Sequence, residues 1–92
     1  MPEKISIIGA GSWGTALALH LAEKFSQISL WVYEQDLCDI LTRTRENEWF
    51  LPGHRLPDNI QPTSSLQSAI EGQPLILLVV PTHVMRQTLS QI

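Results

Sequence analysis

Three closely spaced glycines near the N-terminus constrain the fold of this chain more than any other feature. They follow a short apolar segment rich in isoleucine, residues 4–8, and precede residues 15–25, whose apolar side chains recur at helical spacing. Gly9 permits a tight turn after the strand, and Gly11 has no side chain to hold a phosphate group away from the backbone. Gly14 lets the helix lie close to the sheet. Strand, glycine turn and helix in this order indicate a dinucleotide-binding turn.

The flanking segments carry most of this interpretation, because glycine-rich turns also occur in kinases, in methyltransferases and in loops that bind no ligand. The apolar stripe of the expected helix comprises Leu17, Ala18, Leu21, Ala22 and Phe25. The N-terminus of that helix presents unpaired N–H groups and a partial positive charge to a phosphate. The alternative is a strand, turn and helix with a structural role only.

Composition excludes several functional classes. The chain has 92 residues, 43% of them apolar, which is enough for one domain with a core. A net charge of -3 without a basic stripe argues against nucleic acid as a partner. The single cysteine, Cys38, excludes an intrachain disulfide framework and favours the cytoplasm. We find no leader-like N-terminus and no apolar run that could cross a bilayer, and so expect no membrane partner. His20 and His54 are too scattered for a metal site.

The middle of the chain predicts a second strand, a helix and a loop. Residues 28–33 are apolar or aromatic on both faces, as in a central parallel strand. Asp36 is the expected N-cap of a helix over residues 37–45, with Asp39 at its third position. Residues 47–62, with three prolines, predict a long ordered loop with a short strand near Ile60.

The remaining residues complete half of a larger fold. Ser64 or Ser65 is expected to begin a short helix through Ile70, and residues 75–80 to form another buried parallel strand. Thr82 is the expected cap of a last helix over residues 83–92, after Pro81 closes the strand.

The succession of elements predicts an α/β fold, the first half of a Rossmann-type doubly wound parallel sheet with strand order 3-2-1-4. Residues 1–92 would then be the N-terminal part of a dinucleotide-binding domain, with the remaining strands missing. The strand at 75–80 would offer an open apolar edge, so we expect self-association, as a homo-oligomer, there or through the last helix.

Four motifs together identify a family. Trp13 lies inside the glycine turn, Leu-Trp-Val-Tyr-Glu occupies residues 30–34, and Val-Val-Pro-Thr-His occupies residues 79–83. Residues 47–57 read Asn-Glu-Trp-Phe-Leu-Pro-Gly-His-Arg-Leu-Pro, the most specific of the four. The chain resembles, over essentially its whole length, the N-terminal domain of NAD(P)-dependent glycerol-3-phosphate dehydrogenase.

The resemblance implies hydride transfer between a nicotinamide cofactor and the pair glycerol 3-phosphate and dihydroxyacetone phosphate, small-molecule substrates that supply the glycerol backbone of phospholipids. It implies pyrophosphate contacts from Gly9, Ala10, Gly11, Ser12, Trp13 and Gly14. Tyr33 would lie against the adenosine end. The catalytic lysines of the family come later than residue 92, and its helical substrate domain is also missing, so we expect the chain alone to be inactive.

Residue 33 departs from a pattern common in bacterial relatives, which often place Arg or His there to suit a ribose 2′-phosphate. Glu34, twenty residues after Gly14, is instead placed to accept a hydrogen bond from a ribose 2′-OH and to repel a 2′-phosphate. The sequence therefore predicts a preference for NAD over NADP.

Several assignments keep an alternative. A sister dehydrogenase of the 6-phosphogluconate, hydroxyacyl-CoA or ketopantoate reductase type shares the glycines but not the Leu-Pro-Gly motif, and a non-catalytic NAD-sensing module needs only what is present. Trp13 contacts the cofactor or packs over the turn, whereas Trp31 is expected in the core. Trp49 and Phe50 anchor their loop or contact a second domain. His83 is expected to have a structural or capping role, with a place near the nicotinamide as the alternative.

Overall fold

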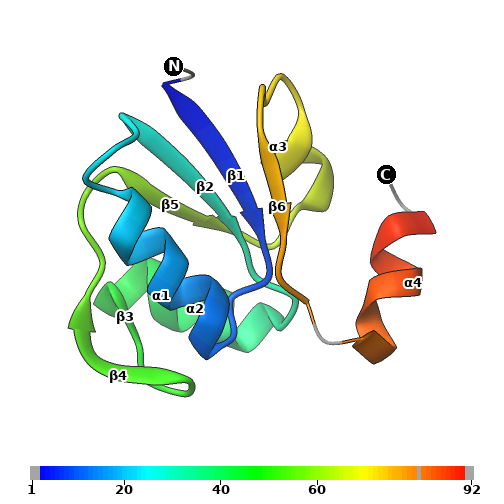
Figure 1. Cartoon of the computed structure of the whole chain (residues 1–92). Coiled ribbons are helices and arrows are strands. Elements are labelled where there is room, and N and C mark those ends of the chain that lie inside the picture. Colours follow the sequence, from blue (N-terminus) through cyan, green and yellow to red (C-terminus); the bar gives the residue numbers. More distant parts are fainter. Residues whose placement is uncertain (1–2, 81, 91–92) are drawn as a thin grey trace.

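A parallel sheet of four strands lies at the centre of the molecule (Figure 1). The structure, a computed structural model, describes residues 3–80 and 82–90. The sheet order is β5-β2-β1-β6, so the four strands, counted along the chain, lie in the order third, second, first and fourth. Their bounds are Lys4–Ile8 for β1, Gln27–Trp31 for β2, Ile60–Thr63 for β5 and Ile76–Leu78 for β6. The predicted α/β fold class is confirmed.

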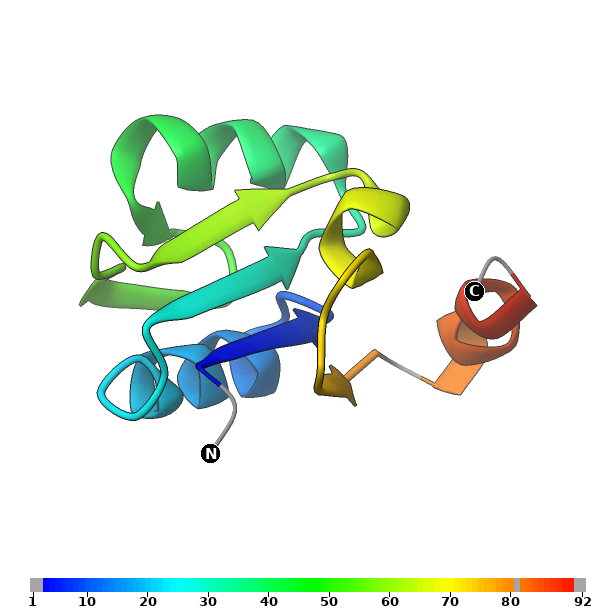
Figure 2. The same cartoon turned by 90° about the horizontal axis from the view of Figure 1, so that it is seen from above.

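Helices cover both faces of the sheet, which is what makes it doubly wound. On β1, Ile5 and Ile7 point to the face packed against helices α1 (Ser12–Leu21) and α2 (Gln35–Thr44). Ser6 and Ile8 point to the opposite face, where helix α3 (Leu66–Ile70) packs. This alternation follows from the two-residue period of a strand. The last helix, α4 (Thr82–Ser90), is set off beyond the end of β6 (Figures 1 and 2).

The first helix is displaced from the predicted 15–25. It begins at Ser12, directly after the N-cap Gly11, and ends at Leu21 with Ala22 as its C-cap. Residues 22–25 instead form a turn whose Ala22 and Phe25 carbonyl oxygens accept hydrogen bonds from the Asn59 side chain, at 2.8 and 3.0 Å. This contact distant in sequence satisfies carbonyl groups that a longer helix would have used.

The predicted N-cap of the second helix is wrong. Glu34 is the N-cap of α2, without a side-chain capping bond, and Asp36 lies in the first turn, where a carboxylate favours the helix dipole. The helix ends at Arg45, which adopts a left-handed conformation with φ of 62°. The Arg45 guanidinium donates to the carbonyl oxygens of Pro57 and Ile60, at 2.6 and 2.8 Å. These bonds hold an arginine in a conformation that glycine usually supplies.

The predicted loop over residues 47–62 contains more regular structure than expected. Strands β3 (Glu46–Asn47) and β4 (Leu51–Arg55) pair antiparallel as a small separate sheet, with a register shift between Glu46 and Asn47. The short strand expected near Ile60 is confirmed as β5. Pro62 lies within it, which is compatible with its position at the edge of the sheet because proline lacks the N–H that a second neighbour would need.

The last strand is shorter and more exposed than predicted. β6 covers only Ile76–Leu78, and residues 75–78 are 37–42% exposed, because β6 is an edge strand that pairs, among the described strands, with β1 alone. The predicted start of α3 is confirmed, since the Ser65 hydroxyl caps it by accepting from the Ser68 N–H at 3.2 Å. Thr82 is the first residue of α4 and not its cap, and Pro81 lies outside the described residues.

Candidate functional site

The glycine turn joins β1 to α1 at the carboxyl edge of the sheet, and two of its glycines are required by packing. Gly9 has φ of 125°, and a Cβ there would collide with the Val79 carbonyl group. A Cβ at Gly14 would collide with the carbonyl oxygen of Gly9. Both contacts involve backbone atoms, which side-chain movement cannot relieve. The roles predicted for Gly9 in the turn and for Gly14 in close packing are confirmed.

Gly11 differs from the other two glycines, because none of the described residues requires it to lack a side chain. Its backbone angles, φ of -70° and ψ of -169°, are open to any residue, and a Cβ would meet no atom of the described residues within 4 Å. Gly11 is also the N-cap of a ten-residue helix, where backbone N–H groups are free of partners within the helix. The space in front of Gly11 therefore suits a group that approaches the backbone closely and carries negative charge.

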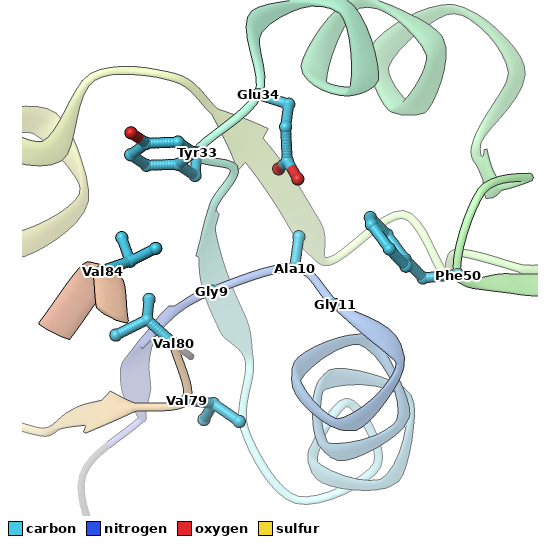
Figure 3. A pocket seen from close by; sticks show the side chains of 9 residues that line it. All are labelled: Gly9, Ala10, Gly11, Tyr33, Glu34, Phe50, Val79, Val80 and Val84. Carbon is cyan, nitrogen blue, oxygen red and sulfur yellow. The ribbon is translucent and has the colours of Figure 1, made fainter. Parts of the chain in front are cut away.

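Gly11 borders a pocket with a volume of about 220 Å³ (Figure 3). The pocket lies at the carboxyl ends of β1 and β2. The strand order changes direction at β1, which has β2 on one side and β6 on the other. Doubly wound sheets bind ligands at such a position. Its walls come from four parts of the chain that are distant in sequence. The lining residues are Gly9, Ala10, Gly11, Tyr33, Glu34, Phe50, Val79, Val80 and Val84.

A second hollow lies beside the first and shares three of its lining residues. It has a volume of about 310 Å³ and is lined by Gly11, Ser12, Trp13, Gly14, Val79 and Val80. Trp13 is 73% exposed, so its indole does not pack over the turn as one of the two predicted alternatives required. The two hollows meet at Gly11, which places the glycine turn between them.

The residues after β2 form the wall opposite the glycine turn. Tyr33 is exposed, and its ring meets that of Trp31 edge to face, with centroids 5.8 Å apart. The Glu34 side chain is half-buried and extends into the pocket on the side of Ala10 (Figure 3). Among the described residues that line the pocket, none is lysine or arginine. The acidic group therefore faces no basic side chain in this wall.

Two residues of the β3–β4 region belong to the site and were not predicted as site residues. Phe50 lines the pocket and meets Trp49 edge to face at 6.3 Å. Asn47 is fully buried and hydrogen-bonded to the glycine turn. Asn47 is the first residue of the Asn-x-x-x-Leu-Pro-Gly motif, so the motif itself was the available signal.

The other candidate residues do not join the pocket. Trp31 belongs to the core, as predicted, with its indole N–H donating to the Ser64 carbonyl oxygen at 3.1 Å. His20 and His54 are exposed on α1 and β4, and the side chain of His83 lies outside the described residues. Within residues 3–80 and 82–90, no group of three or more His, Cys, Asp or Glu side chains is arranged to hold a metal ion. No helix in the described part of the chain is long and apolar enough to cross a membrane.

Comparisons with known proteins agree on one family. The family model of the NAD-dependent glycerol-3-phosphate dehydrogenase N-terminus matches residues 4–92. The glycerol-3-phosphate dehydrogenase [NAD(P)+] of Moorella thermoacetica is 47% identical over 88 residues, which are 96% of this chain and 26% of that protein. The Geobacter metallireducens protein of the same name is 47% identical over 92 residues, 28% of its length. This chain thus spans about a quarter of the length of these relatives.

Solved structures give the same result. The crystal structure of glycerol-3-phosphate dehydrogenase from Coxiella burnetii superposes with a TM-score of 0.92 at 38% identity, over 98% of this chain and 28% of that one. The yeast enzyme superposes with a TM-score of 0.87 at 29% identity, over 99% of this chain and 30% of that one. The similarity therefore extends over nearly the whole chain, glycine turn and β3–β4 region included.

Proposed function

Because this chain belongs to the NAD-dependent glycerol-3-phosphate dehydrogenase family, whose N-terminal part it matches, we propose that residues 1–92 form the NAD-binding part of such an enzyme. The complete enzyme would transfer hydride between the nicotinamide and the pair glycerol 3-phosphate and dihydroxyacetone phosphate. We also propose that the protein is cytoplasmic, in keeping with its single unpaired cysteine, and that it self-associates. Membership of this family rules out the sister-dehydrogenase alternative.

The single observation that supports cofactor binding best is the open space in front of Gly11. A glycine at a position where the fold would accept any residue is explained by a ligand that needs the space. A pyrophosphate there would receive hydrogen bonds from backbone N–H groups of the turn and the first turn of α1, in the field of the helix dipole. Ser12 and Trp13 border the same space.

We propose that the two hollows, which share Gly11, Val79 and Val80 in their linings, hold the two halves of a dinucleotide. In our proposal the adenosine half occupies the pocket with Tyr33 and Glu34, and the nicotinamide half extends past Trp13. The bound nicotinamide supplies the hydride chemistry. The lining residues of this chain bind and orient the cofactor but include no lysine to protonate a carbonyl oxygen or to hold a substrate phosphate. We therefore propose that the chemical step needs residues outside this chain.

We propose further that Glu34 selects NAD over NADP. Its carboxylate is half-buried at the end of β2, where a ribose 2′-OH would donate to it. A 2′-phosphate at the same place would meet a like charge, and no described pocket residue is basic enough to compensate it.

Titration with NADH and with NADPH tests this proposal, followed by energy transfer from tryptophan to the reduced nicotinamide. We expect NADH to bind about tenfold more tightly, the effect of one charged contact at this position. Glu34→Gln should abolish that preference. Asp36→Asn is the matched control, since it removes one carboxylate from the exposed first turn of the same helix and should leave the preference intact.

Each result separates one part of the proposal from the rest. Equal affinity for NADH and NADPH, or a preference that survives Glu34→Gln, would contradict the role of Glu34 but leave cofactor binding supported. Saturable binding without activity in the complete protein would favour the NAD-sensing alternative over the enzyme. Failure of the chain to bind either nucleotide would contradict cofactor binding by these residues.

A further inference from the structure

We infer that Asn47 is a positioning residue that orients the backbone of the glycine turn for a pyrophosphate and fixes Phe50 in the wall of the same pocket. The inference rests on the proposed binding of a dinucleotide. It concerns a side chain that lies behind the turn and lines neither hollow.

The Asn47 side chain is fully buried, and both the nitrogen and the oxygen of its amide make hydrogen bonds. Its Nδ2 donates to the carbonyl oxygen of Ala10 and to the hydroxyl oxygen of Thr15, both at 2.7 Å. Its Oδ1 accepts from the Phe50 N–H at 3.1 Å. A buried amide without partners would destabilise the fold, so these bonds determine the relative positions of the groups that make them. One side chain therefore joins the β3–β4 region to a turn 37 residues earlier in the chain.

The contact with Ala10 fixes the orientation of one peptide plane. The Ala10 carbonyl oxygen is held by Asn47 and also accepts from the Thr15 hydroxyl, at 3.2 Å. In a planar trans peptide the C=O and the following N–H point in opposite directions, and no described peptide bond is cis. The Gly11 N–H therefore points away from the buried amide of Asn47. Rotation of this peptide would turn the carbonyl oxygen, an acceptor, toward the place proposed for an anion.

The contact with Phe50 fixes another part of the pocket wall. The Phe50 ring lies beside Gly11 and Ala10 in the pocket (Figure 3). Its backbone N–H is bonded to the same Asn47 side chain that holds Ala10. The placement of Phe50 relative to the glycine turn thus depends on one buried amide.

If Asn47 only stabilised the fold, its loss and the loss of Asn59 should affect NADH binding alike. Asn59 therefore provides the comparison. Its Nδ2 also donates to two backbone carbonyl oxygens, those of Ala22 and Phe25, at 2.8 and 3.0 Å. Neither acceptor lies in the pocket. Asn59→Ala therefore removes similar bonds to the end of α1 without touching the glycine turn or Phe50.

The test compares Asn47→Ala with Asn59→Ala in the 92-residue chain. We expect both to lower the unfolding temperature, but only Asn47→Ala to weaken NADH binding, by about tenfold, which corresponds to the loss of one positioning hydrogen bond. Thr15→Val, which removes the hydroxyl at nearly constant shape, should weaken NADH binding in the same direction and serves if Asn47→Ala does not fold. Equal affinities for Asn47→Ala and the unaltered chain, or equal losses for Asn47→Ala and Asn59→Ala, would overturn the inference.

Amide hydrogen exchange in the free chain keeps this result separate from the proposed function. Asn47→Ala should accelerate exchange of the Phe50 N–H and shift the Gly11 amide resonance, whereas Asn59→Ala should change neither. Unchanged Phe50 exchange would overturn the inference whether or not a nucleotide binds. If the unaltered chain binds no NADH but these amides respond as expected, the proposed function fails and the positioning of the turn stands.

Discussion

Replacement of Gly11 by alanine should separate cofactor binding from folding. A methyl group at this position meets no atom within 4 Å in the part of the chain that the structure describes, and the backbone angles are ordinary for alanine. The free energy of unfolding should therefore change by no more than about 0.5 kcal/mol. The methyl group would occupy the space that we assign to the pyrophosphate.

The loss of affinity can be worked from the contacts that the methyl group would block. A hydrogen bond from a backbone N–H to a charged oxygen contributes about 1.5–3 kcal/mol. Loss of one or two such bonds amounts to about 3 kcal/mol, a weakening of NADH binding by roughly a hundredfold. The unfolding temperature of Gly11→Ala should differ little from that of the unaltered chain, because the added methyl group alters no contact among the described residues.

Gly14→Ala is the matched control, since it adds the same methyl group three residues later. There the methyl group collides with the Gly9 carbonyl oxygen, so α1 must move away from the sheet. Overpacking of this kind costs about 1–3 kcal/mol, and each kcal/mol lowers the unfolding temperature of a domain this size by about 4–8 °C.

Thermal unfolding by circular dichroism and titration with NADH measure the two effects separately. We expect Gly11→Ala to unfold at the temperature of the unaltered chain and to bind NADH weakly, and Gly14→Ala to unfold at a lower temperature. Full NADH affinity in Gly11→Ala would refute the assignment of the open space to the pyrophosphate. A large loss of stability in Gly11→Ala would refute the inference that the fold tolerates a side chain at residue 11.

Two further predictions concern Cys38 and the edge strand. Burial, reinforced by the nearby Asp39 carboxylate, raises the pKa of the Cys38 thiol. The unfolded chain then loses this proton at lower pH than the folded chain, so stability is complete below the ordinary thiol pKa and falls as the pH rises through the raised one. Cys38→Ala should remove that alkaline decrease in urea unfolding, and an unchanged decrease would contradict the assignment. Leu77, 39% exposed on β6, should promote self-association through the open edge, so light scattering should show less association for Leu77→Lys. A chain that is monomeric at high concentration before the substitution would argue against this surface.

The parts of the fold that depend on local patterns could be predicted from the sequence. The glycine turn, the two central strands and the Ser65 cap each follow from residue types at fixed spacing, and all are present. The helix ends were harder, because they depend on contacts between distant segments. Asn59 satisfies the carbonyl groups at which α1 stops, and Arg45 ends α2 through bonds to Pro57 and Ile60.

In the candidate site, too, local patterns were predictable and contacts between distant segments were not. The glycine turn and Glu34 were predicted from their places after β1 and β2, and Tyr33 from the resemblance to the family. All of these residues except Ser12, Trp13 and Gly14 line one pocket. Phe50 and Asn47 were not predicted as site residues, because the prolines around them indicated a long ordered loop. The antiparallel pairing of β3 and β4 and the buried amide of Asn47 bring this region to the glycine turn. The Asn-x-x-x-Leu-Pro-Gly motif marked this region, but its approach to the glycine turn depends on tertiary contacts that residue spacing does not encode.

The most direct test of the central claim, that the glycine turn and the pocket beside it bind the cofactor, is an NMR titration of the isotopically labelled chain with NADH. We expect saturable shifts concentrated at the amides of residues 9–14, 33, 34 and 50, with the largest at Gly11. Shifts concentrated on α3 or the β6 edge, or no shifts at saturating NADH, would contradict it.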